Sequence, residues 1–353
     1  MRGLLAKGMF AAVVSLAGGM FLGAAPVPVA QKPLQIYFVD VEGGQATLFV
    51  TPEGKSLLID TGWPGNNGRD ANRIAAAAKD AGIKRIDFVL ITHYHDDHVG
   101  GAPQLAAKIP VGTFIDHGEN RETSDAGASR VFAAYQKLLS RGKYKHITAK
   151  PGEVLPITGM QVRVVTADGE LIERPLPGGG GNENANCANA PKPPVDVTEN
   201  PRSLGTLITF GKLRILDLGD LTSDKEMDLM CPMNKIGAVD IYVASHHGFL
   251  QSGSAVLVHG IAPRVAIMDN GAKKGGSPAA WDVIEKAPEL EDLWQLHYSE
   301  ESGDTHNVAA PFLANLQGPD AGNYLKVTAL ADGSFEVFNS RTRETKKYAA
   351  KKN

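Results

Sequence analysis

The sequence is poor in cysteine and in charge of either sign, and each shortage excludes a class of protein. Only two of its 353 residues are cysteine, too few for a small disulfide scaffold. Charged residues make up 21% and apolar residues 43% of the chain, a balance too apolar for a disordered protein. No heptad or collagen-like period runs through it. The Gly-x-Ser-x-Gly motif and the full Gly-x-x-x-x-Gly-Lys-Ser/Thr phosphate loop are also missing, so neither of these common catalytic sites is expected.

Residues 1–30 predict an export signal. A basic start (Arg2, Lys7) precedes an apolar run over residues 9–25, and a small residue suited to cleavage ends the segment at Ala30. The run is short for a membrane span, which needs about 20 apolar residues, so an uncleaved anchor is the weaker alternative. No later stretch is apolar enough to cross a bilayer. We therefore expect a periplasmic or secreted protein with no transmembrane segment beyond the signal.

The expected mature chain is mildly acidic. Residues 1–30 hold two basic residues and no acidic one, which leaves 34 basic and 39 acidic residues, a net charge of −5. Surfaces that bind nucleic acid are typically basic. We therefore expect no stable binding of nucleic acid.

Cys187 and Cys231 can form a disulfide in an exported protein, because an oxidising compartment permits one. Cys187 lies in a Gly- and Asn-rich loop, and Cys231 follows an expected helix. A bridge would tie the loop down, while two free thiols are the alternative. Neither cysteine has the spacing of a metal ligand.

Apolar runs and turn residues predict an α/β chain in two similar halves. The first half has expected strands at 34–41, 45–51, 56–60, 86–92 and 111–116, and helices at 69–81, 102–108 and 126–141. The second half has expected strands at 205–210, 213–217, 239–244, 264–268, 293–297, 323–329 and 334–338, and helices at 223–230, 254–261 and 278–287. Hairpins at both ends, with alternating strands and helices between them, favour a four-layer αββα sandwich over a doubly wound sheet.

The run HYHDDH at 93–98 holds three imidazoles and two carboxylates directly after an apolar strand. Residues two apart on an extended segment share a face, so His93 and His95 can face one cation. After the chain turns, Asp97 and His98 can face a neighbouring cation. Imidazole and carboxylate together suit zinc, iron or manganese. A polar loop with a chance cluster is the alternative, which ten histidines in 353 residues make improbable.

This run resembles the His-x-His-x-Asp-His signature of the metallo-β-lactamase superfamily. Three further segments resemble that family's motifs in the same order: LLIDTG (57–62), LDLGDL (216–221) and VASHHG (243–248). The resemblance covers about residues 34–300 and implies the family's αββα sandwich. It also implies that Asp60 orients ligands, that Asp220 bridges the metals and that His246 is the final ligand. Without the family, a helix cap would explain Asp220 and a core position would explain His246.

The neighbouring His246 and His247 require a choice. Both cannot face one metal from an extended strand end, and His246 is preferred because a single linking residue separates it from the strand. His247 then becomes a candidate catalytic residue that contacts substrate or protonates a leaving group. Asp97 is the other residue expected to take part in catalysis.

The family's usual third imidazole on the first metal is not evident. His117 and His146 are the candidates in chain order, but neither lies directly before the strand at 205–210. This departure resembles the extracytoplasmic domain of competence-type DNA-uptake proteins, which has Asn-x-x-Ser before that strand. The resemblance therefore implies Asn200, Ser203 or water as the completing group.

The ligands predict the chemistry. A bound metal pair would lower the pKa of water and polarise the bond attacked, so no activated serine or cysteine is needed. We predict an exported metal-dependent hydrolase with one or two Zn²⁺ ions, or with Mn²⁺ or iron instead. The competence-type resemblance favours a phosphodiester substrate, with nucleic acid as one candidate, and a small-molecule substrate is the other expectation. A β-lactam or lactone hydrolase, an iron-dependent oxidoreductase and a non-catalytic binding protein are the alternatives.

Ligands about 120 residues apart must meet at one site, which favours one domain over two. We place this domain at 31–345, with a Gly-, Pro- and Asn-rich insertion near 166–203 and a polar tail at 346–353. Two weaker features accompany it. Lys273-Lys274 fits either an exposed turn or a contact with phosphate. Trp63 would either line the pocket or pack against its neighbours as a structural residue.

Overall fold

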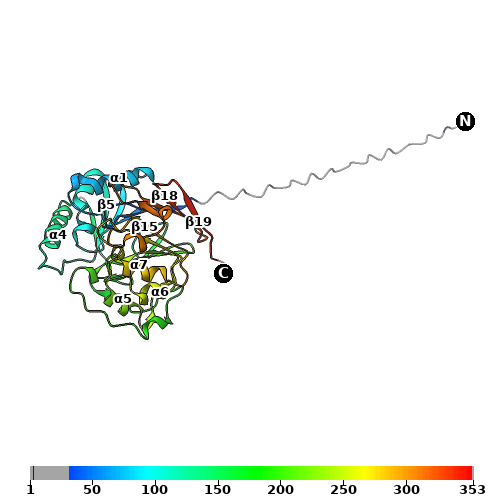
Figure 1. Ribbon diagram of the computed structural model, residues 1–353. Helices are drawn as coiled ribbons and strands as arrows, with labels where there is room; N and C mark the ends of the chain where they lie inside the picture. Colours follow the sequence, from blue (N-terminus) through cyan, green and yellow to red (C-terminus); the bar gives the residue numbers. More distant parts are fainter. Residues whose placement is uncertain (1–2, 4–31, 143, 352–353) are drawn as a thin grey trace. The chain divides into compact units, whose positions relative to one another are not determined.

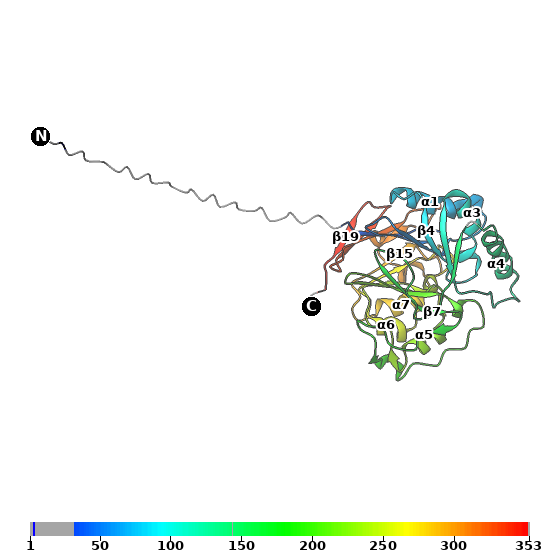
Figure 2. The same ribbon diagram turned by 180° about the vertical axis from the view of Figure 1, so that it is seen from behind.

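Two mixed β-sheets organise the part of the chain that the computed structural model describes, which comprises residue 3, residues 32–142 and residues 144–351. From residue 32 onward these residues form one compact unit. The two sheets lie face to face, with one group of helices on each outer side (Figures 1 and 2). The export signal expected at 1–30 lies, apart from Gly3, outside the described residues.

The first sheet has nine strands in the order β19–β18–β17–β1–β2–β3–β4–β5–β6. Strands β3 to β6 run parallel to one another, and all other neighbours are antiparallel. The strands are β1 (Leu34–Phe38), β2 (Thr47–Val50), β3 (Ser56–Ile59), β4 (Ile86–Leu90), β5 (Val111–Asp116), β6 (Lys145–Thr148), β17 (Leu325–Ala329), β18 (Phe335–Asn339) and β19 (Thr345–Tyr348).

The second sheet has eight strands in the order β16–β15–β14–β13–β11–β10–β7–β8. Its strands from β11 to β16 are parallel, and β10, β7 and β8 continue the sheet as antiparallel neighbours. The strands are β7 (Gln161–Ala167), β8 (Glu170–Leu171), β10 (Gly205–Phe210), β11 (Leu213–Asp217), β13 (Ile241–Val243), β14 (Val265–Met268), β15 (Asp292–His297) and β16 (Leu313–Asn315). A separate two-stranded ladder joins β9 (Asn182–Glu183) to β12 (Met233–Asn234).

Helices cover the outer faces of both sheets. The first sheet packs against α1 (Arg69–Asp80), α3 (Ala102–Lys108) and α4 (Ala126–Leu139), and the second against α5 (Ser223–Met230), α6 (Ala255–Ile261) and α7 (Pro278–Glu285). The short elements are α2 (Asp96–Val99), η1 (Asn66–Gly68), η2 (Ala185–Cys187), η3 (Asn200–Arg202), η4 (Ser245–Gly248), η5 (Gly303–Thr305) and η6 (Ala310–Phe312). None of the described helices is both long and apolar enough for a membrane span.

Alternation along the strands builds three apolar layers. In β1, Ile36 faces the core between the sheets, whereas Tyr37 faces the helices on the first sheet. In β11, Ile215 faces the same inter-sheet core, and Leu216 faces the helices on the second sheet. This layering of helix, sheet, sheet and helix confirms the expected αββα sandwich.

The structure adds order to two segments expected to be irregular, and it corrects the expected start of the polar tail. The polar tail expected at 346–353 begins inside β19, which pairs with β18. Tyr348 is 2% exposed, and its hydroxyl lies 2.6 Å from Asp292 Oδ2, so one buried aromatic residue anchors an otherwise exposed edge strand. The insertion expected near 166–203 contains the end of β7 and several short elements, and Cys187 forms a disulfide with Cys231.

Candidate metal centre

The site residues follow the carboxyl ends of strands from both sheets. Asp60 follows β3 and His93 follows β4, both in the first sheet. Asp220 and the pair His246-His247 follow β11 and β13 in the second sheet. Because the carboxyl ends of parallel strands share one edge, packing of the two sheets brings these residues together.

His93 and His95 lie side by side at the end of β4. The Nε2 atom of His93 is 3.1 Å from Nδ1 of His95. The other nitrogen of each ring has a separate partner: Thr92 Oγ1 lies 3.0 Å from His93 Nδ1, and Glu122 Oε2 lies 2.9 Å from His95 Nε2. Each imidazole is therefore held from behind, with one nitrogen facing the site.

Asp97 and His98 come from α2, the single helical turn that follows. Both are buried, and His98 Nε2 lies 3.2 Å from Asp97 Oδ2. The opposite nitrogen of His98 is 2.7 Å from Asp60 Oδ2, which also accepts a hydrogen bond from the Thr92 hydroxyl. Gly44 packs against this turn so closely that a Cβ atom there would lie 2.4 Å from the Asp97 carbonyl oxygen.

Asp220 lies between two groups of imidazoles. Its Oδ1 is 3.2 Å from His98 Nε2 and 3.4 Å from His247 Nε2. Its Oδ2 is 3.3 Å from His246 Nε2 and 3.8 Å from His93 Nε2. Both carboxylate oxygens are buried and lack a hydrogen-bond partner among the described residues.

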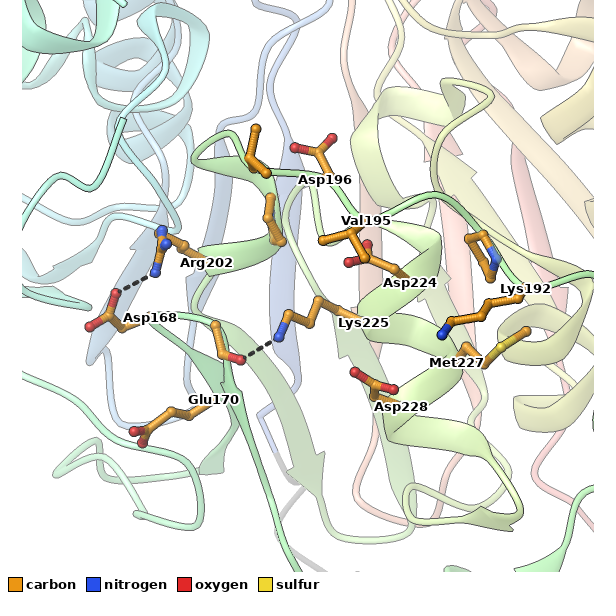
Figure 3. A pocket seen from close by; sticks show the side chains of 14 residues that line it. Asp168, Glu170, Lys192, Val195, Asp196, Arg202, Asp224, Lys225, Met227 and Asp228 are labelled. Atoms are coloured by element: carbon orange, nitrogen blue, oxygen red, sulfur yellow. Dashed lines mark hydrogen bonds and ion pairs between the residues drawn. The ribbon is translucent and has the colours of Figure 1, made fainter. Parts of the chain in front are cut away.

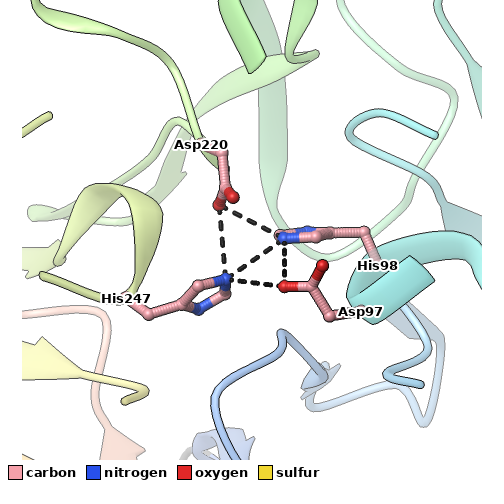
Figure 4. Close-up of side chains that lie close together, drawn as sticks. All are labelled: Asp97, His98, Asp220 and His247. Atoms are coloured by element: carbon pink, nitrogen blue, oxygen red, sulfur yellow. Dashed lines mark hydrogen bonds and ion pairs between the residues drawn. The ribbon is translucent and has the colours of Figure 1, made fainter. Parts of the chain in front are cut away.

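The strand end carrying His246 and His247 is not extended. Both residues have φ of 55° within η4, a left-handed backbone that non-glycine residues seldom adopt. The choice between the two residues assumed an extended strand end, and that assumption does not hold here. His247 joins Asp97, His98 and Asp220 in a group whose ligand atoms all lie within 4.8 Å of one another (Figure 4). The structure thus places His247, expected to contact substrate or to protonate a leaving group, among the candidate ligands.

Opposite charges keep the site's carboxylates ionised. Burial alone would raise the pKa of Asp97, but Lys274 and His98 hold it well below its usual range. Burial likewise acts to raise the pKa of Asp220, and the surrounding imidazoles outweigh this effect and lower it.

Burial lowers the pKa of His246 to about 4, so its imidazole is neutral at neutral pH. Nearby carboxylates outweigh burial at the other two rings and raise the pKa of His98, and that of His247 to about 9, so a cation bound there would displace a proton. Ionised carboxylates and a neutral imidazole are the forms that bind cations.

Lys274 extends from the loop after β14 to the edge of the site. Its ammonium forms an ion pair with Asp97 and lies 5.1 Å from the centre of the Trp63 ring. The Lys274 side chain is 31% exposed, while that of Asp97 is 5% exposed. Lys274 therefore presents positive charge at the solvent side of the site, whereas the adjacent Lys273 is exposed.

Ser203 and Asn200 have different positions. The Ser203 hydroxyl accepts a hydrogen bond from the backbone N–H of Asp220 at 3.2 Å and lies 3.5 Å from His93 Nδ1. Asn200 is buried in η3, where its Oδ1 lacks a hydrogen-bond partner among the described side chains. No contact of Asn200 with the imidazoles or carboxylates of the site is seen among them.

His117 and His146, the expected candidates for a third imidazole, are bound to carboxylates elsewhere. His117 Nε2 lies 3.1 Å from Glu199 Oε2, and His146 Nε2 lies 2.7 Å from Asp116 Oδ2. Neither belongs to the group around Asp220.

Several residues that support the site were not predicted. Thr92 and Glu122 hold the first two imidazoles, Asp269 Oδ1 lies 3.2 Å from His247 Nδ1, and Ser252 Oγ lies 3.3 Å from His246 Nδ1. Asp269 directly follows β14, so its place at a strand end was a usable signal. Glu122 and Ser252 lie in loops and carry no comparable signal.

Two adjoining cavities lie outside the group of candidate ligands. One, of about 550 Å³, is bordered by the turn at 168–170, the segment 192–197 and α5 (Figure 3). Arg202 and Asp168 form an ion pair at its wall. A more apolar cavity of about 810 Å³ adjoins it and includes Leu250. None of the candidate ligands lines either cavity.

The donor set fits a transition-metal cation. Imidazole nitrogens and carboxylate oxygens converge from two sheets, and the inner oxygens of Asp220 have no other partner among the described residues. Buried carboxylates without partners are costly, and a cation would satisfy them. Zinc, manganese and iron all accept this mixture of ligands.

The sequence comparisons place this architecture in a known family. Residues 39–183 match the model of the metallo-beta-lactamase superfamily. A hydroxyacylglutathione hydrolase of Stenotrophomonas maltophilia is 30% identical over 30% of this chain and 37% of its own. A metal-dependent hydrolase of Polynucleobacter asymbioticus is 30% identical over 46% of this chain and 51% of its own. Residues 39–183 therefore match a metallo-β-lactamase superfamily domain, which confirms the resemblance seen in the motifs.

Two further similarities reach across both halves of the chain. Recombination protein 2 of Haemophilus influenzae is 22% identical over 67% of this chain and 24% of its own length. Among solved structures, a metallo-beta-lactamase fold protein of Bacillus subtilis shares 14% identity, with a TM-score of 0.46 over 75% of this chain and 96% of its own. The chain spans about half or less of the curated relatives that it matches.

Proposed function

We propose that this chain is an exported metal-dependent hydrolase that cleaves an ester-type bond in an anionic substrate, with a phosphodiester favoured. One observation carries the proposal. Both oxygens of the buried Asp220 carboxylate face imidazole nitrogens and lack hydrogen-bond partners within the described part of the chain. A cation held there would act as a Lewis acid, lowering the pKa of water and polarising the bond attacked.

Residues around the site would orient the side chains that bind the cation. Asp60 and Glu122 accept hydrogen bonds from the outer nitrogens of His98 and His95, which keeps the inner nitrogens directed at the site. Ser203 fixes the backbone of Asp220. These contacts pre-organise the ligands, so little rearrangement would accompany cation binding.

Lys274 supports an anionic substrate. Its partly exposed ammonium lies beside the buried Asp97 and over Trp63, at the solvent side of the ligands. A lysine in this place can bind a phosphate oxygen as a point charge. The similarity to recombination protein 2 of Haemophilus influenzae also favours a phosphodiester substrate.

Two features support export. The N-terminal residues have the basic and apolar pattern of a secretory signal. The disulfide between Cys187 and Cys231 fits an oxidising compartment, since such bonds seldom persist in the cytosol.

The test combines metal quantification with a substrate panel. The purified chain would be assayed with bis(4-nitrophenyl) phosphate, a lactone, a thioester and a β-lactam, each with and without a chelator. We expect chelator-sensitive turnover of the phosphodiester, and its loss in Asp97→Ala and His98→Ala. His306→Ala is the matched control, because His306 lies outside the candidate ligands.

Each other outcome contradicts a defined part of the proposal. Turnover that survives the chelator and both variants would remove the metal-dependent mechanism. Chelator-sensitive turnover confined to the thioester, lactone or β-lactam would replace the phosphodiester. Iron in the purified protein, together with oxygen consumption and no hydrolysis, would favour the oxidoreductase alternative.

A further inference from the structure

The two neighbouring histidines of η4, His246 and His247, offer an imidazole that the expected ligand set lacks. The expected site for a first cation has His93 and His95 but lacks a third imidazole from the middle of the chain. His117 and His146, the two histidines between His98 and Asp220, are bound to Glu199 and Asp116 instead. The missing nitrogen must therefore come from another part of the fold, or the site is incomplete.

The backbone of η4 turns both neighbouring imidazoles inward. Adjacent side chains of an extended strand point to opposite faces, but His246 and His247 both have φ of 55° and Gly248 has φ of 74°. Left-handed backbone at non-glycine residues is strained and persists only where the surroundings impose it.

Hydrogen bonds from three directions impose this turn. The His246 N–H donates to the Gly219 carbonyl at 3.0 Å, and the His247 carbonyl accepts from the Gly276 N–H at 2.8 Å. The Phe249 N–H closes the turn on the His246 carbonyl at 2.8 Å. The left-handed turn is thus fixed by its neighbours, among them Gly219, the residue before Asp220.

The two rings reach opposite oxygens of Asp220. His246 Nε2 lies 3.3 Å from Oδ2, the oxygen that also faces His93. His247 Nε2 lies 3.4 Å from Oδ1, the oxygen that also faces His98. His247 belongs to the group of Asp97, His98 and Asp220, whereas His246 lies outside that group, with its ring centroid 6.2 Å from that of His247.

Both rings are also held from behind, as metal-binding histidines typically are. His246 Nδ1 lies 3.3 Å from Ser252 Oγ, and His247 Nδ1 lies 3.2 Å from Asp269 Oδ1. Each Nε2 is therefore the nitrogen directed at Asp220.

We propose that this histidine pair is divided between two cations. His246 would complete the first with His93 and His95, and His247 would complete the second with Asp97 and His98. Asp220 would give one oxygen to each, so each cation has four protein ligands. The assignment rests on the metal binding in the proposed function, but it concerns which residue holds which ion and does not depend on the substrate.

Asparagine variants give the sharpest test, because asparagine tolerates left-handed backbone and removes the imidazole. His246→Asn, His247→Asn and the double variant would be stripped of metal, titrated with Zn²⁺ and analysed for bound zinc by mass spectrometry. Competition with a chromophoric chelator would give the affinity of each site. Far-UV circular dichroism would verify that each variant is folded.

We expect two zinc ions in the wild-type chain, one in each single variant and none in the double variant. The lost site should weaken by about 100-fold or more, because changes at outer-shell partners alone cost about 10–100-fold. His95→Ala should reproduce His246→Asn, and His98→Ala should reproduce His247→Asn. His306→Ala should keep two ions.

A His246→Asn variant that keeps two ions with unchanged affinity would overturn the proposal. A double variant that still binds one ion would overturn it as well, because both histidines would then serve the same site. If the wild-type chain binds two ions as described but hydrolyses no substrate, the ligand assignment stands and the proposed function fails. A wild-type chain that binds no zinc, manganese or iron would remove both.

Discussion

The Asp60 carboxylate holds His98 from the side opposite the ligand group, with 2.7 Å between Oδ2 and Nδ1. The carboxylate accepts the Nδ1 proton, while Asp220 and Asp97 raise the pKa of His98 from the other side, so a bound cation would take the place of the Nε2 proton. The backbone N–H of Thr92 donates to the other Asp60 oxygen at 2.8 Å, so the carboxylate itself is fixed. Asp60 therefore selects the form of His98 that can bind a cation.

We predict that Asp60→Asn weakens metal binding by about 10–100-fold, the usual effect of changing an outer-shell carboxylate. The asparagine amide would donate toward Nδ1 and favour the proton on Nε2. It tolerates the left-handed backbone of Asp60, which has φ of 59°, so the fold should be kept. Chelator competition would measure the affinity, with exposed Asp228→Asn as the control. An unchanged affinity would show that Asp60 has only a structural role.

Lys274→Met should reduce kcat/KM for an anionic phosphodiester by about 10- to 100-fold, the range for a lost hydrogen bond to a charged group. Turnover of a neutral lactone should fall much less, and zinc content should not fall, since the change frees Asp97. Exposed Lys273→Met is the matched control and should behave as wild type. Equal losses for anionic and neutral substrates would instead mean that Lys274 acts by positioning Asp97.

The cluster at 93–98 could be predicted because its geometry is local. Four of its side chains are brought together by one strand end and one helical turn, so spacing alone was informative. The Lys274–Asp97 pair joins residues 177 apart in sequence, and no local pattern signals such a contact. The sequence allowed a phosphate contact at Lys274 but could not distinguish it from a surface turn.

The backbone at His247 was not predictable, for a different reason. The apolar run before it indicated a strand, and alternation along a strand permits only one of two adjacent histidines to face the site. The left-handed turn at η4 is imposed by Gly219 and Gly276, which are distant in sequence. Tertiary hydrogen bonds thus overrode the local preference.

The layered fold was largely predictable, since buried strands and amphipathic helices have strong periodic signals. The missed strands include β7 and β16, which are largely buried, and two strands with few apolar residues. β6 has three exposed residues out of four, and β19 has only Tyr348 buried. Edge strands of this kind depend on pairing with a neighbour that is already in place.

The disulfide between Cys187 and Cys231 closes a loop of 44 residues. On the chain-entropy account, a loop of this length stabilises the folded state by up to about 4 kcal/mol. We predict that the double Cys→Ser variant has a free energy of unfolding lower by up to that amount, measured by urea denaturation. Its zinc content should be unchanged, because neither cysteine belongs to the candidate ligands. A variant as stable as wild type, or wild-type thiols that react with a labelling reagent without reductant, would contradict the bridge.

Glu226 of α5 should make the stability of the fold depend on pH. Its carboxylate is fully buried and accepts hydrogen bonds from the backbone N–H groups of Gly253 and Ser254, at 2.7 and 2.8 Å. Burial raises its pKa to about 7, from 4.5 in an exposed glutamate. The folded state therefore holds a proton that the unfolded state releases between these two values. The free energy of unfolding should fall as pH rises through this window, by up to about 3 kcal/mol.

Comparison of wild type with Glu226→Gln isolates this contribution. The difference in their free energies of unfolding, measured by urea denaturation from pH 4.5 to 8, should shift in favour of the variant as pH rises, because glutamine cannot ionise. The metal ligands titrate alike in both proteins and cancel in the difference. Exposed Glu300→Gln controls for the loss of one carboxylate. Parallel curves for wild type and Glu226→Gln would mean that the two backbone hydrogen bonds already stabilise the ionised carboxylate in the buried site.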